Sequence, residues 1–106
     1  MVKLLILFQH PEDESSFEQH YVKNLALLEE MPGIQRRQAN MVRGAPGGKS
    51  PYYRILEFYF KDFEALDAAL TSEAGLIAGR QLISTVGDLV ELHFVDVFED
   101  NTPVEL

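Results

Sequence analysis

The stretch PYYRILEFYF, residues 51–60, decides the fold of this chain. A proline opens it, and a run of aromatic and branched side chains follows, which favours a β-strand over a helix. Alternation places Leu56, Phe58 and Phe60 on one face of the strand. The opposite face carries Tyr53, Ile55, Glu57 and Tyr59. Because both faces are largely apolar, we predict a central strand that is covered on both sides.

The segments around this strand predict three more strands and two helical regions. We expect a strand at residues 2–9, which is apolar on both faces, and strands at 34–43, which alternates without a clean apolar face, and 88–98, where Val90, Leu92 and Phe94 alternate with Glu91, His93 and Val95. A first helix begins near Asp13 or Ser15, where Ser15 and Glu18 have the spacing of a capping box. A second begins after Asp62 and is followed by a helical segment to about Ile83.

This order of elements, with right-handed crossovers, predicts an α+β fold of the ferredoxin-like, split βαβ type. We expect one domain over residues 1–106, with a four-stranded antiparallel sheet in the order 4-1-3-2 and its helices on one face. The other face then exposes a large apolar surface, which a second copy of the chain would cover. We therefore expect a homodimer that forms a dimeric α+β barrel.

Composition and charge exclude several classes of function. The chain has 106 residues, no cysteine and a net charge of −8, so we expect neither thiolate chemistry nor nucleic-acid binding. The apolar run at residues 2–8 is too short to cross a bilayer, and we expect a soluble, cytoplasmic protein with no membrane partner.

Charge is distributed unevenly along the chain. The second strand and the loop after it are basic, with Arg36, Arg37, Arg43 and Lys49, whereas the last strand and its end carry Glu91, Asp96, Glu99 and Asp100. In a two-fold dimer we expect these two edge strands to lie side by side with complementary charge. The tail, residues 100–106, is expected to be a loose end.

One candidate site lies on the first helix. His20 and Asn24 stand one helical turn apart, with Tyr21 beside them. In the functional interpretation His20 is a catalytic base, and Tyr21 and Asn24 bind a ligand in a pocket between the helix and the sheet. In the alternative, His20 is a boundary residue at the helix surface.

A second candidate site lies on the sheet face turned away from the helices. Glu57 and Tyr59 point there, and His93 comes from another strand. A carboxylate, a phenol and an imidazole on one enclosed face are typical of acid–base catalysis, with Glu57 and Tyr59 catalytic and His93 binding the ligand. They are equally typical of a polar network at a dimer interface.

The sequence has neither the histidine spacing of a common metal site nor the glycine spacing of a phosphate-binding loop. The histidines lack HxH, HxxxH and HExxH spacing, so we expect no metal and no cofactor. The loop GAPGGKS, residues 44–50, lacks the spacing of a phosphate-binding loop and leads into a strand instead of a helix.

Several stretches carry a family resemblance that covers about residues 2–98. The chain resembles the EthD family of the dimeric α+β barrel superfamily in LLILFQHPEDESSFEQHY at residues 4–21, MPGI at 31–34, RILEFYF with KDFEALDAALTSEAG at 54–75, and VELHFVDVFE at 90–99. The resemblance implies a ferredoxin-like subunit in a homodimer. Family members commonly have a second histidine and then a proline after the HY pair, where this chain has Asn24 and Ala26. Asparagine cannot act as a general base.

These observations lead to two hypotheses about function. In the first, an EthD-like homodimer binds a small organic molecule and transforms it by cofactor-independent acid–base chemistry at the barrel. In the second, the protein is a non-enzymatic binding or assembly module in which the same polar groups satisfy one another. Asn24 favours the second hypothesis, and a face with Glu57 and Tyr59 favours the first.

Overall fold

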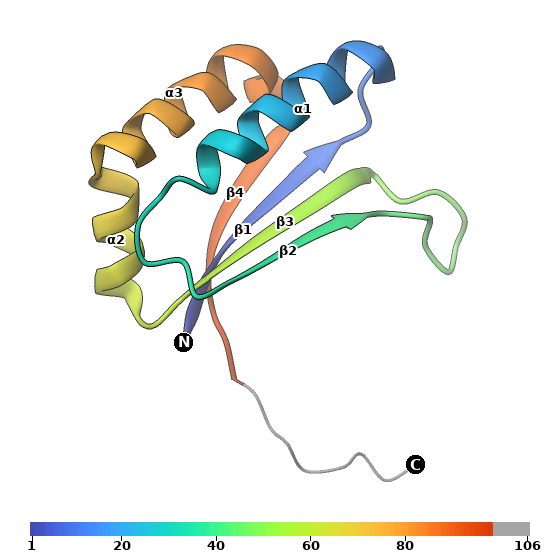
Figure 1. Cartoon of the computed structure of the whole chain (residues 1–106). Helices are drawn as coiled ribbons and strands as arrows, with labels where there is room; N and C mark the ends of the chain where they lie inside the picture. The colour runs from blue at the N-terminus through green and yellow to red at the C-terminus, as the bar shows by residue number, and fades with distance from the viewer. Residues whose placement is uncertain (99–106) are drawn as a thin grey trace, which may run out of the picture.

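The structure, a computed structural model, describes residues 1–98 as one antiparallel sheet with helices packed on one side of it (Figure 1). Its elements are β1 Val2–Gln9, α1 Glu14–Leu28, β2 Arg36–Met41, β3 Tyr52–Phe60, α2 Phe63–Thr71, α3 Glu73–Val86, a 3₁₀ turn at Gly87–Leu89, and β4 Val90–Asp96. The sheet order is β2-β3-β1-β4, which confirms the ferredoxin-like fold and the strand order predicted from the sequence. Within this described part of the chain, no helix is long and apolar enough to cross a membrane.

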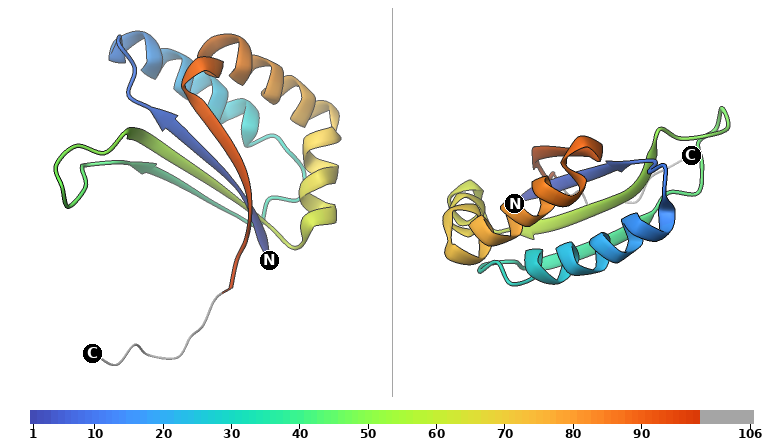
Figure 2. Two further views of the ribbon diagram at one scale, coloured as in Figure 1. Left: turned by 180° about the vertical axis from the view of Figure 1, so that it is seen from behind. Right: turned by 90° about the horizontal axis from the view of Figure 1, so that it is seen from above.

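The hydrophobic core lies between the helices and one face of the sheet (Figure 2). Leu56, Phe58 and Phe60 of β3 are fully buried there, as the alternation predicted. Neighbouring core side chains come from β1 and all three helices and include Ile6, Phe8, Phe17, Leu28, Leu66 and Leu82. Burying such side chains contributes about 1.5–3 kcal/mol each, and this packing fixes α1 and α3 over the sheet. Within residues 1–98, no helix lies over the opposite face of the sheet (Figure 2).

The helix starts and strand ends differ in detail from the sequence-based expectation. Asp13 is the N-cap of α1 and accepts a hydrogen bond from the Ser16 backbone N–H at 3.1 Å. The predicted capping box of Ser15 and Glu18 is therefore wrong. Glu18 pairs with Arg54 of β3 instead. The last strand begins later than expected because the 3₁₀ turn occupies Gly87–Leu89. The predicted loose tail, and the acidic residues Glu99 and Asp100, lie outside the described residues.

A β-bulge changes the direction of one tyrosine. The pairing of β1 with β3 shifts between Phe8, which lies opposite Arg54, and Gln9, which lies opposite Tyr52. Tyr53 is the extra residue of the bulge, and its ring meets Phe17 of α1 edge-on at 5.5 Å. The prediction that Tyr53 shares the open face with Ile55 is therefore wrong.

Candidate functional site

One side of α1 faces the basic strands β2 and β3. Glu18, Tyr21, Leu25 and Glu29 follow one another at helical spacing and form this side. Glu18 pairs with Arg54 of β3, and Glu29 pairs with Arg37 of β2. The two ion pairs join α1 to the sheet at two places. We call the pocket at the Glu29–Arg37 end, together with the buried contact that runs along α1 from it to Tyr21 and Glu18, the α1–β2 cleft.

The inner end of the cleft is held by the Glu18 carboxylate. Arg54 donates to it with Nη2 at 2.8 and 2.9 Å and with Nε at 3.1 Å, and the Tyr53 hydroxyl donates at 2.8 Å. Burial alone would raise the pKa of Glu18, but the hydrogen bonds from Arg54 and Tyr53 and the Arg54 charge outweigh it and lower the pKa. This network gives α1 a fixed position over β3.

The lowered pKa makes a prediction about acid stability. A carboxyl group whose pKa is lower in the folded state stabilises the fold above its unfolded pKa, near 4.5, and this contribution is lost as the pH falls through the folded value. We expect Glu18→Gln to cost about 1–3 kcal/mol at pH 7 and much less at low pH. Urea denaturation at pH 7 and in the acid range, compared with Glu12→Gln on the exposed turn, measures this difference. An equal cost at both pH values would contradict the assigned role of Glu18.

Tyr21 lies inside the cleft next to both arginines. Its side chain is 5% exposed, and its hydroxyl has no hydrogen-bond partner within residues 1–98. The Arg54 guanidinium lies over its ring, 4.3 Å from the centroid. Burial raises the pKa of the Tyr21 hydroxyl, and the charge of Arg54, the approach of its N–H groups to the hydroxyl oxygen and the charge of Arg37 offset this only in part. Because Arg54 can only donate, the hydroxyl hydrogen still has no acceptor within residues 1–98. Tyr21 is thus a neutral, buried hydrogen-bond donor without an acceptor, which is costly unless something else binds there.

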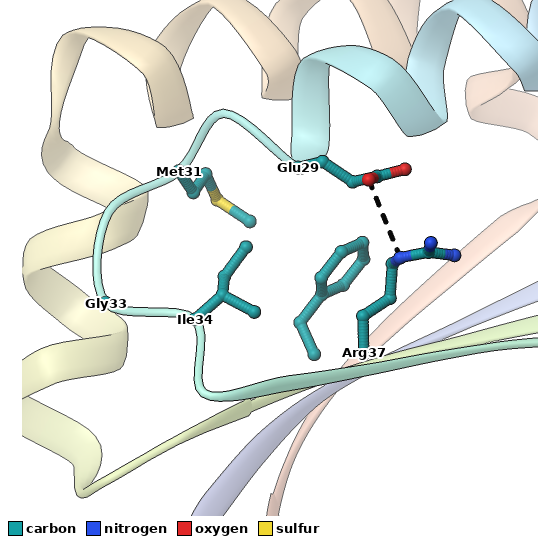
Figure 3. A pocket seen from close by; sticks show the side chains of 6 residues that line it. Glu29, Met31, Gly33, Ile34 and Arg37 are labelled. Carbon is teal, nitrogen blue, oxygen red and sulfur yellow. Dashed lines mark ion pairs between the residues drawn. The ribbon is translucent and has the colours of Figure 1, made fainter.

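The outer end of the cleft opens into a pocket of about 270 Å³ (Figure 3). Met31, Ile34 and Phe58 supply its apolar walls, and Glu29 and Arg37 stand at its rim. Arg37 points to the helix side because it lies opposite Phe58 in the β2–β3 register. Its Nε is 3.6 Å from a carboxylate oxygen of Glu29, and both side chains are partly exposed. Such a pair contributes about 0–1 kcal/mol and separates easily.

The turn after α1 shapes this pocket. Gly33 has φ 84°, in the left-handed region that favours glycine. The turn returns the chain toward β2 and places Ile34 and Arg37 around the pocket (Figure 3).

The open face of the sheet carries a separate group of polar residues. Lys3 donates to Glu57 at 2.8 Å, Asn40 donates to Glu57 at 3.1 Å, and the Tyr59 hydroxyl donates to Gln38 at 3.1 Å. The hydrogen bond to Glu57 raises the pKa of Lys3, although burial opposes it. Glu57 and Tyr59 do share this face, as predicted. Their polar groups already have hydrogen-bond partners within the subunit: Lys3 and Asn40 for Glu57, and Gln38 for Tyr59.

His93 does not join Glu57. Leu5 of β1 lies opposite both residues in the sheet register and so stands between them. Two strand spacings separate His93 from Glu57, about 10 Å. The acid that His93 does approach is Glu91 of its own strand, with 3.8 Å between Nε2 and Oε1.

The remaining predicted site residues lie on the side of α1 that faces α3. Asn24 is 1% exposed, and its amide donates to the Thr85 hydroxyl of α3 at 3.0 Å, while its Oδ1 has no partner within residues 1–98. The structure thus places Asn24 between two helices instead of in a helix–sheet pocket, and His20 lies one turn before it. The predicted site residues are therefore divided among three places: the α1–β2 cleft, the open face of the sheet, and the side of α1 near α3. In the described part of the chain, no three His, Asp or Glu side chains gather as a metal site.

Comparison with known proteins identifies relatives of the whole chain. An EthD family protein of Bacillus halodurans has a crystal structure that superposes with a TM-score of 0.89 at 30% identity, covering 92% of this chain and 99% of that one. An uncharacterized 11.0 kDa protein of Rhodococcus erythropolis, from the thcB–thcC intergenic region, is 25% identical over 97 residues, 91% of this chain and 94% of that protein. No family model matches the sequence.

A third comparison concerns the fold alone. A dimeric ferredoxin-like protein of unknown function from Jannaschia sp. superposes with a TM-score of 0.70 at 20% identity, covering 92% of this chain and all of that one. The sheet, its helices and these neighbours define a ferredoxin-like α+β protein. The chain belongs to the EthD family, which confirms the resemblance carried by its sequence.

Proposed function

We propose that this EthD family protein is a homodimer that binds a small organic anion in the α1–β2 cleft of each subunit. The observation that carries the proposal is the buried Tyr21 hydroxyl, which has no acceptor within residues 1–98, while Arg54 lies over the Tyr21 ring and the charge of Arg37 acts on the hydroxyl. A ligand oxygen supplies the missing acceptor, and the guanidinium of Arg37 supplies the matching charge.

The pocket suits a molecule with one charged end and an apolar body. Arg37 exchanges its weak contact with Glu29 for a ligand carboxylate or enolate, while Phe58 and Ile34 pack against hydrocarbon. Because the pKa of Tyr21 is raised, its hydroxyl stays protonated at neutral pH and donates to the ligand oxygen. A donor of this kind also stabilises an oxyanion that develops during proton transfer, so cofactor-independent acid–base chemistry stays a prediction.

The open face of the sheet is better suited to dimer assembly than to catalysis. Glu57 is already held by Lys3 and Asn40, and the half-buried side chains Leu5 and Ile55 lie beside this network. A second copy that packs on this face removes the apolar side chains from water. The neighbour from Jannaschia, described as dimeric, supports a dimer. Catalytic roles for Glu57, Tyr59 and His20, ligand binding by Asn24 and His93, and a cytoplasmic location all stay predictions.

Calorimetric titration with 3-phenylpropionate tests the cleft. We expect Arg37→Gln to weaken binding about tenfold or more, because it removes the charge that meets the carboxylate. We expect Tyr21→Phe to weaken binding about threefold to tenfold without lowering stability, because the hydroxyl it removes has no partner in the described structure.

The matched control is Arg80→Gln, which removes an exposed arginine from α3. Arg80→Gln changes the net charge by the same amount as Arg37→Gln. We expect it to leave binding unchanged, because the position of the Arg37 guanidinium matters and the net charge does not. Wild-type protein that does not bind 3-phenylpropionate or other aryl and alkyl carboxylates, or Arg37→Gln protein that binds them like the wild type, would overturn the proposal.

A further inference from the structure

A second cavity, wholly apolar, lies between the helices and the sheet on the side of β4. It has a volume of about 100 Å³, and Leu4, Leu28, Met31, Gly79, Leu82 and Phe94 are among the residues that line it. Every side chain along its wall is a hydrocarbon or thioether group. A cavity of this kind stays dry, and one of about 150 Å³ accepts a benzene molecule. A ring therefore enters this smaller cavity only together with movement of a flexible wall residue such as Met31.

The two glycines of α3 that border this cavity serve different purposes. A Cβ at Gly75 would lie 2.1 Å from the backbone oxygen of Ala69, so glycine is required for α3 to approach α2. A Cβ at Gly79 would have no atom within 4 Å. A glycine inside a helix costs about 0.5–1 kcal/mol relative to alanine, so Gly79 lowers stability and leaves free space where α3 borders both the cavity and an open groove beside Ile83.

The cavity is bordered by partly exposed residues of β4 and shares one wall residue with the pocket of the α1–β2 cleft. Leu92 and Phe94 of β4, which line it, are 45% and 57% exposed. Met31 lines both this cavity and the pocket beside Arg37. Its flexible thioether side chain adapts to a neighbouring group more easily than a branched one.

We infer that this cavity receives the hydrocarbon part of the ligand whose anionic group binds in the α1–β2 cleft. The ligand is then a carboxylate or enolate joined to a compact apolar group, a single aromatic ring or a short branched alkyl of about four to six carbons. The inference rests on the proposed function for the anionic end of the ligand, whereas the apolar end rests on the cavity and on Gly79.

Two variants and three probe molecules test the apolar cavity and the anionic cleft separately. Gly79→Leu fills the cavity from a position with free space, and Gly79→Ala fills less of it with no expected cost in stability. Gly47→Leu is the control, because a Cβ at Gly47 also meets nothing within 4 Å and the residue lies in the β2–β3 loop. Benzene probes the apolar cavity alone, propionate probes the anionic cleft alone, and 3-phenylpropionate probes both.

For the wild type and Gly47→Leu we expect benzene to raise the melting temperature saturably, and 3-phenylpropionate to bind at least about tenfold tighter than propionate. Gly79→Leu loses the benzene effect and this tenfold preference, and Gly79→Ala weakens both. Equal binding of benzene and 3-phenylpropionate by Gly79→Leu and the wild type would overturn the inference, even where Arg37→Gln still weakens binding. Loss of the benzene effect in Gly79→Leu with no effect of Arg37→Gln would overturn the anionic cleft and leave the cavity assigned.

Discussion

Replacing Ile55 by lysine is expected to turn the proposed homodimer into a folded monomer. Ile55 lies on the open face of β3, opposite Leu7 of β1 and Asn40 of β2. Its side chain reaches no helix, so in a single subunit the lysine ammonium extends into water. In the dimer the same ammonium is buried against apolar side chains and costs several kcal/mol, because Glu57, the carboxylate beside it on that face, already binds Lys3 and Asn40. We expect the dimer dissociation constant to rise about a hundredfold or more.

Sedimentation velocity over a range of concentrations measures this effect, and circular dichroism checks that the subunit stays folded. The control is Val22→Lys, which places the same charge on α1 at a side chain that is 64% exposed. A dimer of unchanged affinity in Ile55→Lys protein would show that the open face is not the subunit interface.

A second large effect is expected from adding one methyl group to α3. Gly75→Ala brings a Cβ to 2.1 Å from the Ala69 oxygen and 2.7 Å from the Leu70 oxygen, both backbone atoms that cannot rotate away. Helix α3 must then move from α2, and we expect a loss of about 3 kcal/mol or more in the free energy of unfolding. Gly79→Ala, one turn later, meets no atom and is expected to gain about 0.5–1 kcal/mol.

Urea denaturation of both variants at one protein concentration tests this pair. The two substitutions are chemically identical and lie on the same helix, so propensity alone predicts the same gain for both. Similar stability of the two variants would contradict the close contact of α2 and α3, and with it the shape of the apolar cavity.

The architecture was predictable because each strand carries its own pattern. Leu56, Phe58 and Phe60 alternate regularly, and this fixed the face that meets the helices. Tyr53 broke the pattern because a bulge depends on how β3 pairs with Gln9, which lies far away in the sequence. Local alternation holds no information on such a shift in register.

The candidate site was harder to predict than the fold. The spacing of Glu18, Tyr21 and Glu29 on one side of α1 was visible in the sequence, but α1 also presents Asn24 on another side. The partner of Asn24 is Thr85, 61 residues away, so the helix alone did not show which side faces the sheet. The separation of His93 from Glu57 did follow from the predicted strand order, because β1 lies between their strands.

A crystal structure of the protein grown with 3-phenylpropionate tests the central claim most directly. We expect one molecule in each subunit, with its carboxylate within hydrogen-bond distance of Arg37 and the Tyr21 hydroxyl and its ring directed past Met31. A molecule bound between the two sheets at Glu57 and Tyr59, or a cleft with no molecule in it, would show that the α1–β2 cleft is not the ligand site.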